Sequence, residues 1–209
     1  MAIVDWGERE RLDMKVDMDT LNRRERYALL TSLIVPRPIA WVSTCSVNGG
    51  DNLAPFSFFG GVSASPPVLA ISIGSRRGEP KDTVRNILGN GEFVVNLATV
   101  AQADLVERTA EEFPYEVSEA KALGLTLLES ERVAPGRLEE SPVQLECRLV
   151  QTVFPQDAEV HLFLGEVLLA HVQEDLMEKG VVDASRLDPL MRLGGGCYGS
   201  LGEIIRPGS

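Results

Sequence analysis

The 209-residue sequence has little of the chemistry that metal sites, disulfide frameworks and membrane spans require. It holds two histidines, and no group of histidine, cysteine and carboxylate has metal-ligand spacing, so we expect no protein-bound metal. Its three cysteines lie far apart, which argues against a disulfide framework and favours a reducing compartment. The charged first fifteen residues are unlike a signal peptide, and the most apolar stretch, residues 161–172, is too short to span a bilayer. We therefore expect a cytoplasmic protein without a membrane partner.

Positive charge is also scarce. Lysine and arginine number 20 against 31 aspartates and glutamates, which gives a net charge of −11. Nucleic acids and anionic membranes are bound by an excess of cations, so we expect neither as a partner. The length suggests one domain over residues 1–209 that can bury a core without disulfides. A phosphorylated ligand would need a local cationic site.

Short apolar runs separated by turn signals predict a mainly β fold with helical insertions, either a barrel or a sandwich. A helical lead-in is expected over about residues 1–35, capped by Asp19 or Thr20, and an acidic helical insertion over about 99–140. A further helix is expected over residues 80–88 because Pro80 suits a first helical turn. Strands are expected at residues 39–45, 52–59, 67–73, 92–97, 143–153 and 158–172.

Neighbouring segments differ sharply in charge. Residues 38–75 contain one charged side chain, Asp51, and Pro55 within them suggests an edge strand or a bulge. Residues 74–90 carry a net charge of +2, from Arg76, Arg77, Lys81 and Arg85 against Glu79 and Asp82. This arrangement suits a ligand with a flat neutral body and an anionic end. The alternative is an ordinary barrel core beside solvated arginines.

Residues 99–140 have the opposite balance, with ten acidic and four basic residues. This is the pattern of a solvated helical face, and it would also suit docking of a basic redox protein.

Residues 194–199 spell G-x-G-x-x-G, but only ten residues follow, too few for a dinucleotide-binding βαβ unit. We expect a loop there instead.

Three segments resemble the flavin reductase-like family. They are PRPIAWVST at 36–44, NLAPFSFFGGVSASPPVLAISIG at 52–74 and KDTVRNILGNGEFVVNL at 81–97, with a looser match at RLGGGCYG, 192–199. The resemblance implies an FMN-binding split β-barrel of the Greek-key antiparallel kind. It also implies a homodimer with the flavin near the interface, where a partner loop around residues 194–198 would complete the pocket.

The resemblance also implies which residues bind FMN. The isoalloxazine would be lined, largely by backbone groups, by Trp41, Val42, Ser43, Thr44, Asn52, Leu53, Ala54, Pro55 and Ser57. The phosphate side would be formed by Ser72, Arg76, Lys81, Asp82 and Thr83. Asp82 is expected to cap a helix or orient Lys81, because its charge would repel phosphate. The Trp41 side chain could pack on the flavin or belong to the core. No catalytic side chain is expected, because flavin N5 carries the chemistry.

Two functions fit this resemblance. The first is an NAD(P)H-dependent flavin oxidoreductase that transfers hydride to FMN. The second is a flavoredoxin-like electron carrier that holds FMN tightly, exchanges electrons with a redox protein and has no direct NAD(P)H activity. A third hypothesis, from composition alone, is a barrel-type binding module in which the cationic segment has no role in ligand binding. The sequence contains no nicotinamide signature that separates the first two.

Overall fold

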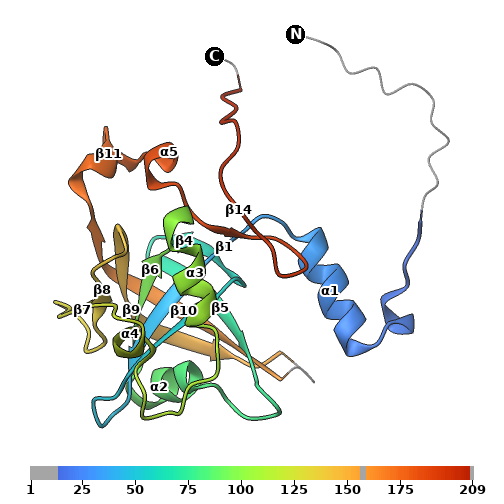
Figure 1. The fold of residues 1–209 in the computed structure, drawn as a ribbon, viewed down its shortest axis with the longest axis horizontal. Helices are drawn as coiled ribbons and strands as arrows, with labels where there is room; N and C mark the ends of the chain where they lie inside the picture. Colours follow the sequence, from blue (N-terminus) through green and yellow to red (C-terminus); the bar gives the residue numbers. More distant parts are fainter. Residues whose placement is uncertain (1–13, 156–158, 208–209) are drawn as a thin grey trace.

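The computed structural model describes residues 14–155 and 159–207 and is dominated by one curved antiparallel sheet (Figure 1). Seven strands lie in the order β3-β2-β6-β9-β10-β5-β4. In chain order these strands are β2 (Ala40–Cys45), β3 (Asp51–Phe56), β4 (Phe59–Ala64), β5 (Pro67–Gly74), β6 (Glu92–Leu97), β9 (Val143–Val153) and β10 (Val160–Val172). The mainly β fold class predicted from the sequence is confirmed.

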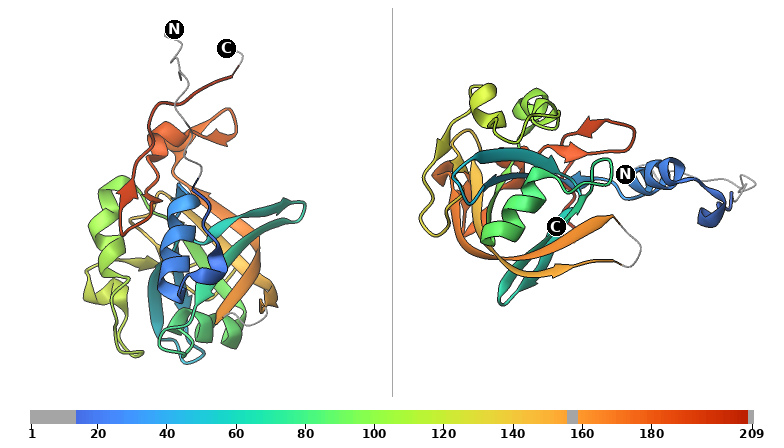
Figure 2. Two further views of the ribbon diagram at one scale, coloured as in Figure 1. Left: turned by 90° about the vertical axis from the view of Figure 1, so that its right-hand side faces the viewer. Right: turned by 90° about the horizontal axis from the view of Figure 1, so that it is seen from below.

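The sheet is open between its two end strands, β3 and β4, although it curls strongly around its core (Figure 2). The resemblance implied a split β-barrel of the Greek-key kind; the described strands form an open, curled sheet and do not close into a barrel. Pro55 lies in β3, and a proline, which lacks an N–H, is tolerated at a sheet edge. In β4, the register against β5 shifts between Gly61 and Ser63. The proline in β3 and the register shift in β4 both disfavour backbone hydrogen bonding between these two end strands.

The concave face of the sheet encloses the main hydrophobic core. In β5 alternate residues are buried, and Ile71 and Ile73 pack with Phe93 of β6 and Phe163 of β10. Helix α2 (Asp82–Asn90) adds apolar side chains to this core and ends at Gly91, whose φ of 73° is the left-handed conformation that glycine adopts readily. The helix starts two residues later than predicted, with Lys81 as its N-cap.

The outer face of β2 and β3 carries a second core, covered by the acidic segment 99–140. Trp41 is fully buried there, and its Nε1 donates a hydrogen bond to Thr109 Oγ1 at 2.8 Å. The segment is less helical than predicted, because it combines short elements with loops. These elements are η2 (Val100–Gln102), α3 (Ala103–Arg108), α4 (Glu119–Ala122), β7 (Leu127–Leu128) and β8 (Arg137–Leu138).

Helix α1 (Arg23–Leu33) projects to one side of the sheet, after the short turn η1 (Met18–Thr20) (Figures 1 and 2). Its N-cap is Asn22, rather than Asp19 or Thr20, because Asn22 and Glu25 form a reciprocal capping box. The part of the predicted lead-in before residue 14 lies outside the described residues. Across residues 14–155 and 159–207, no helix is long and apolar enough to cross a membrane.

A small sheet near the base of α1 joins the two ends of the described chain. It pairs β1 (Arg37–Pro38) with β13 (Met191–Arg192), and β13 with β14 (Tyr198–Gly199). The G-x-G-x-x-G residues lie in the connection between β13 and β14 and at β14 itself, with no helix described after them. The remaining elements are η3 (Glu174–Leu176), β11 (Met177–Glu178), β12 (Val181–Val182) and α5 (Ala184–Leu187).

Candidate functional site

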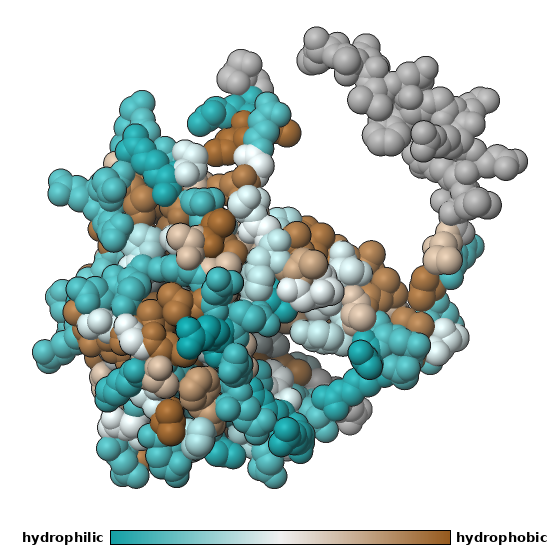
Figure 3. All heavy atoms as spheres, viewed as in Figure 1, coloured by the Kyte–Doolittle hydropathy of each residue, from teal (hydrophilic) through white to brown (hydrophobic). Residues whose placement is uncertain are grey.

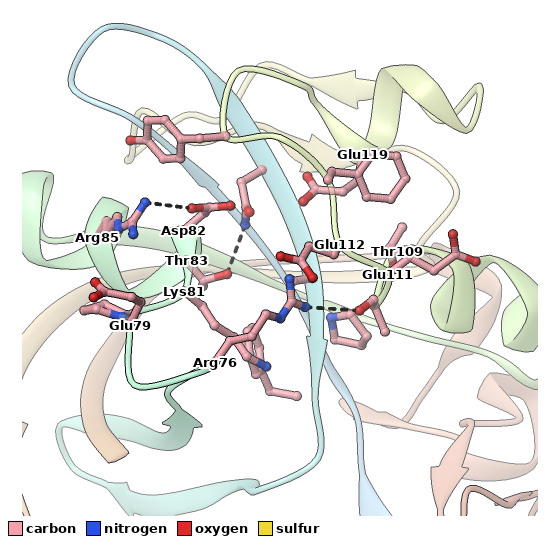
Figure 4. Close-up of a pocket in the computed structure, with 18 of the residues that line it drawn as sticks. Arg76, Glu79, Lys81, Asp82, Thr83, Arg85, Thr109, Glu111, Glu112 and Glu119 are labelled. Atoms are coloured by element: carbon pink, nitrogen blue, oxygen red, sulfur yellow. Dashed lines mark hydrogen bonds and ion pairs between the residues drawn. The ribbon is translucent and has the colours of Figure 1, made fainter. Parts of the chain in front are cut away.

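A cavity of about 360 Å³ lies between β3, the start of α2 and the acidic segment (Figure 4). This volume is within the range of small-molecule sites, roughly 300–1,000 Å³. The cavity is lined by Asn52, Ala54, Pro55, Phe56, Arg76, Arg77, Glu79, Pro80, Lys81, Asp82, Thr83, Arg85, Thr109, Ala110, Glu111, Glu112, Phe113, Tyr115 and Glu119. We call it the main cavity.

Two cations of the main cavity lack an anionic partner among the described residues. Lys81 and Arg76 form no salt bridge to any described residue. Arg76 donates to the Ala110 carbonyl at 3.4 Å, and the Lys81 ammonium lies 5.4 Å from the centre of the Phe56 ring. Burial, and then the nearby Arg76, lower the pKa of Lys81. A bound anion would oppose both effects, so this pair is suited to an anion, and we call it the anion-binding corner.

The other charges of the main cavity are mixed: two ion pairs offset part of them, while Glu79 and Glu111 line the cavity without a salt bridge to a described residue. Arg77 pairs with Glu112 at 3.2 Å, and Arg85 pairs with Asp82 at 3.4 Å. Glu119 is buried, and burial raises the pKa of its carboxyl group. A raised pKa favours the neutral form, which limits the negative charge beside Arg76.

The start of α2 adds to the anion-binding corner. The side chain of its N-cap, Lys81, makes no capping hydrogen bond, and helix N-termini attract anions through their free N–H groups and dipole. The Thr83 hydroxyl is held by Asn52, whose amide is best oriented with its oxygen accepting from Thr83 Oγ1 at 3.0 Å and its nitrogen donating to Glu119 Oε1 at 3.3 Å. Glu119 in turn accepts from the Leu53 N–H at 2.8 Å. These polar groups are thus fixed before any ligand arrives.

A second cavity, of about 170 Å³, adjoins the main cavity along β3. Both cavities are lined by Pro55, Phe56 and Ala110, and the second cavity is completed by Tyr27, Ile39, Ser57, Glu107, Arg192 and Tyr198.

Arg192 and Tyr198 both bind Glu107 at the wall of the second cavity. The Tyr198 hydroxyl donates to Glu107 Oε2 at 2.5 Å, and Arg192 donates to the same oxygen at 3.1 Å. Burial and the hydrogen bond to Glu107 raise the pKa of Tyr198 to about 12. The hydrogen bond from Tyr198 lowers the pKa of Glu107, so this residue is a carboxylate at neutral pH.

The predicted site residues fall into two groups. The first lines the cavities: Asn52, Ala54, Arg76, Lys81, Asp82 and Thr83 in the main cavity, Pro55 in both and Ser57 in the second. The second group lies in the sheet, outside both cavity linings: Trp41, Val42, Ser43, Thr44, Leu53 and Ser72.

Several members of the second group are engaged within the protein. The Ser43 hydroxyl donates to the Gly136 carbonyl at 2.5 Å, and Thr44 Oγ1 accepts from Asn86 at 3.0 Å. Strand β2, which contains them, pairs with β3 on one side and β6 on the other. A flavin-binding role for these residues stays a prediction.

Sequence reasoning missed the wall formed by the acidic segment. Thr109, Phe113, Tyr115 and Glu119 line the main cavity from residues that follow α2 and β6 in the chain. No local pattern marks them, because their place depends on how the segment folds back over β3. Arg192 and Tyr198 could have been proposed as site residues from the sequence, because both lie in the segment 192–199 that resembles the family.

Known proteins match this chain over most of its length. The family described as Flavin reductase like domain matches residues 32–191. A protein from Halalkalibacterium halodurans is 40% identical over 198 residues, which are 92% of this chain and 94% of the relative. The structure of nitrilotriacetate monooxygenase component B from Bacillus cereus has a TM-score of 0.88 and 34% identity, covering 93% of this chain and 98% of that one. The 2-nitrobenzoate 2-nitroreductase of Pseudomonas fluorescens has a TM-score of 0.82 and 30% identity, covering 92% and 94%. The chain is therefore a member of the flavin reductase like domain family.

Proposed function

We propose that this protein binds FMN and acts as an NAD(P)H-dependent flavin oxidoreductase. The observation that carries the proposal is the anion-binding corner, where Arg76, Lys81 and the start of α2 meet beside the uncharged residues 52–56 of strand β3. Membership of the family and the two solved relatives, a monooxygenase component and a nitroreductase, support redox chemistry. The flavin supplies the electron-transfer chemistry when it is bound, and the chain supplies binding and orientation.

Each part of the main cavity has a task in this proposal. Arg76 and Lys81 hold the phosphate, the first through its forked guanidinium and the second as a point charge. Ala54, Pro55 and Phe56 offer apolar surface to the ring system. The linked Asn52 and Glu119 side chains are polar groups suited to the hydroxyls between ring and phosphate. Asp82 pairs with Arg85 and neither caps α2, whose N-cap is Lys81, nor pairs with Lys81 as the sequence led us to expect; in this proposal it does not contact the phosphate.

Direct reduction by nicotinamide nucleotides tests this function. The purified full-length chain is expected to bind FMN and to oxidise NADH or NADPH when FMN is present, measured as loss of the reduced nucleotide's absorbance. No oxidation of either nucleotide by protein that has bound FMN would refute the reductase activity. Rapid electron exchange with a reduced ferredoxin in that case would support the flavoredoxin-like carrier instead.

We also propose that the protein is a homodimer that forms through α1. Tyr27, Leu30 and Leu33 are 62%, 40% and 67% exposed, and the following Ile34 and Val35 are exposed as well. Within this fully described helix, Thr31 is the one buried residue. Hydrophobic side chains are visible along the projecting helix in Figure 3. Contiguous exposed apolar surface of this kind marks an association site. Tyr27 also lines the second cavity, so this apolar surface extends to the rim of that cavity.

Substitution of Leu33 by glutamate is expected to convert the dimer to monomer, because a charge would have to be buried in the apolar contact. Size-exclusion chromatography with light scattering measures the mass. Leu88→Glu on α2 is a matched control, since Leu88 is 50% exposed on a different helix. A wild-type protein that is monomeric at all concentrations, or a Leu33→Glu variant that stays dimeric, would contradict the proposed interface.

A further inference from the structure

The second cavity is lined by two side chains with hydrogen-bond donors that have no acceptor among the described residues. Arg192 carries five N–H donors. Its guanidinium lies over the Tyr198 ring, 4.4 Å from the ring centre, and donates to Glu107 through one nitrogen at 3.1 Å, which leaves other N–H donors without a described acceptor. Ser57 Oγ accepts from Arg37 Nε at 3.4 Å, and no described residue accepts the hydroxyl proton of Ser57. Both groups line the cavity, so a ligand with acceptor oxygens would meet donors from two sides.

The charge behind this cavity is positive. Arg37 is only 6% exposed and forms no salt bridge within residues 14–155 and 159–207. Its guanidinium binds the carbonyl oxygens of Thr31 at 2.5 Å and Ile34 at 2.6 Å as well as Ser57. Arg192 is offset by Glu107. Arg37 has no anionic partner among the described residues, and its charge is met only by carbonyl oxygens, including that of Leu193 at 3.4 Å, and by the Phe58 ring at 5.7 Å. A monoanion would be favoured over a neutral ligand of the same shape.

The size and the walls of the cavity restrict the body of the ligand. Ile39, Pro55 and Phe56 form an apolar surface, and the volume of about 170 Å³ is below the ~300 Å³ lower limit of drug-sized sites. A single ring fits this description better than a fused ring system or a nucleotide. Because Pro55 and Phe56 also line the main cavity, such a ring would lie beside whatever occupies that cavity.

We propose that the second cavity binds a small aromatic carboxylate, with its carboxylate on Arg192 and Ser57 and its ring against Ile39 and Pro55. The ligand class follows from this chain's own donors, charge and apolar walls. That the ligand would lie next to a flavin, as the second substrate, rests on the proposed function.

Benzoate is the probe for this site. Isothermal titration calorimetry of the full-length protein, with and without added FMN, should show benzoate binding about tenfold or more tightly than neutral benzamide, the scale of one charge-assisted hydrogen bond. Arg192→Ala should abolish this preference. Ser57→Ala should weaken benzoate binding about three- to tenfold, as expected for loss of one hydrogen bond. Equal affinities for benzoate and benzamide in the wild-type protein would overturn the proposal.

Control variants separate binding from folding. Arg186→Ala removes an arginine that pairs with Asp183 at 3.5 Å near α5, outside both cavity linings, and should leave benzoate affinity unchanged. Circular dichroism reports whether each variant is folded. If Arg192→Ala does not fold, the Ser57→Ala variant still tests the site. A folded Arg192→Ala variant with wild-type benzoate affinity would also overturn the proposal. Benzoate binding without FMN binding would reject the proposed function and leave this site standing.

Discussion

Replacing Lys81 with alanine is expected to weaken FMN binding by about 1–3 kcal/mol, the range of a charge-assisted hydrogen bond at a partly buried site. Lys81 forms no salt bridge to a described residue, and burial lowers its pKa, so a bound phosphate would supply a counterion and favour the charged ammonium. Arg76→Ala should have an effect of similar size, for the same reason. Fluorescence titration of FMN measures both, and each factor of ten in Kd corresponds to about 1.4 kcal/mol.

Riboflavin, which lacks the phosphate, is the decisive second ligand. Its affinity should change much less in both variants, because the ring and its hydroxyl chain contact other residues. Arg77→Ala is the control, since Arg77 lies on the same loop but is neutralised by Glu112 and largely exposed. Equal losses for FMN and riboflavin would mean that Lys81 and Arg76 do not hold the phosphate.

Replacing Glu146 with alanine is expected to destabilise the fold by about 3–5 kcal/mol, as when one partner of a buried ion pair is removed. Glu146 lies on β9 and is fully buried. Its carboxylate accepts from the backbone N–H of Glu131 at 3.0 Å and of Arg132 at 2.6 Å, and it contacts His171 Nε2 at 2.6 Å. Alanine would leave these groups without their partner. Denaturant unfolding, followed by circular dichroism, measures the change.

The effect of Glu146 should depend on pH. Burial opposes its ionisation, but hydrogen bonds from the Glu131 N–H, His171 and the Arg132 N–H outweigh it and lower the pKa from its ordinary 4.5. The stabilisation by the carboxylate is therefore fully present above pH 4.5 and is lost as the pH falls through the lower pKa of the folded state. The difference in unfolding free energy between the wild type and Glu146→Gln should shrink over that range. A difference that does not vary with pH would contradict this account.

Strands with a clear apolar pattern could be predicted from the sequence, and those with a weak pattern could not. Residues 92–97 and 143–153 match β6 and β9 at both ends. Strand β4 was missed because its sequence, FGGVSA, combines two glycines with small residues and is largely exposed. Residues 52–59 were expected to form one strand, whereas β3 ends at Phe56 and β4 begins at Phe59. A strand on a poorly buried edge leaves little hydrophobic signal.

The same distinction holds for the site. Arg76 and Lys81 are close in the sequence, and a charge contrast reveals them without any knowledge of the fold, whereas Thr83 was indicated only by the family resemblance. The position of Trp41 could not be settled, because all six residues of β2 are buried and the usual alternation between faces is absent. Glu119 gave no signal, since its role depends on a contact with Leu53, 66 positions away. Long-range contacts of this kind follow from topology, which the local pattern does not encode.

The Arg37 side chain forms hydrogen bonds to two segments that lie far apart in the sequence. One guanidinium binds the carbonyls of Thr31 and Ile34 at the end of α1 and the carbonyl of Leu193, at 3.4 Å, in the loop before β14. Because these acceptors share a single buried donor group, the helix and the loop cannot detach independently without exposing it. The end of α1 and the loop between β13 and β14 therefore form one cooperative unit, and their amide hydrogens should exchange with solvent in the same opening event.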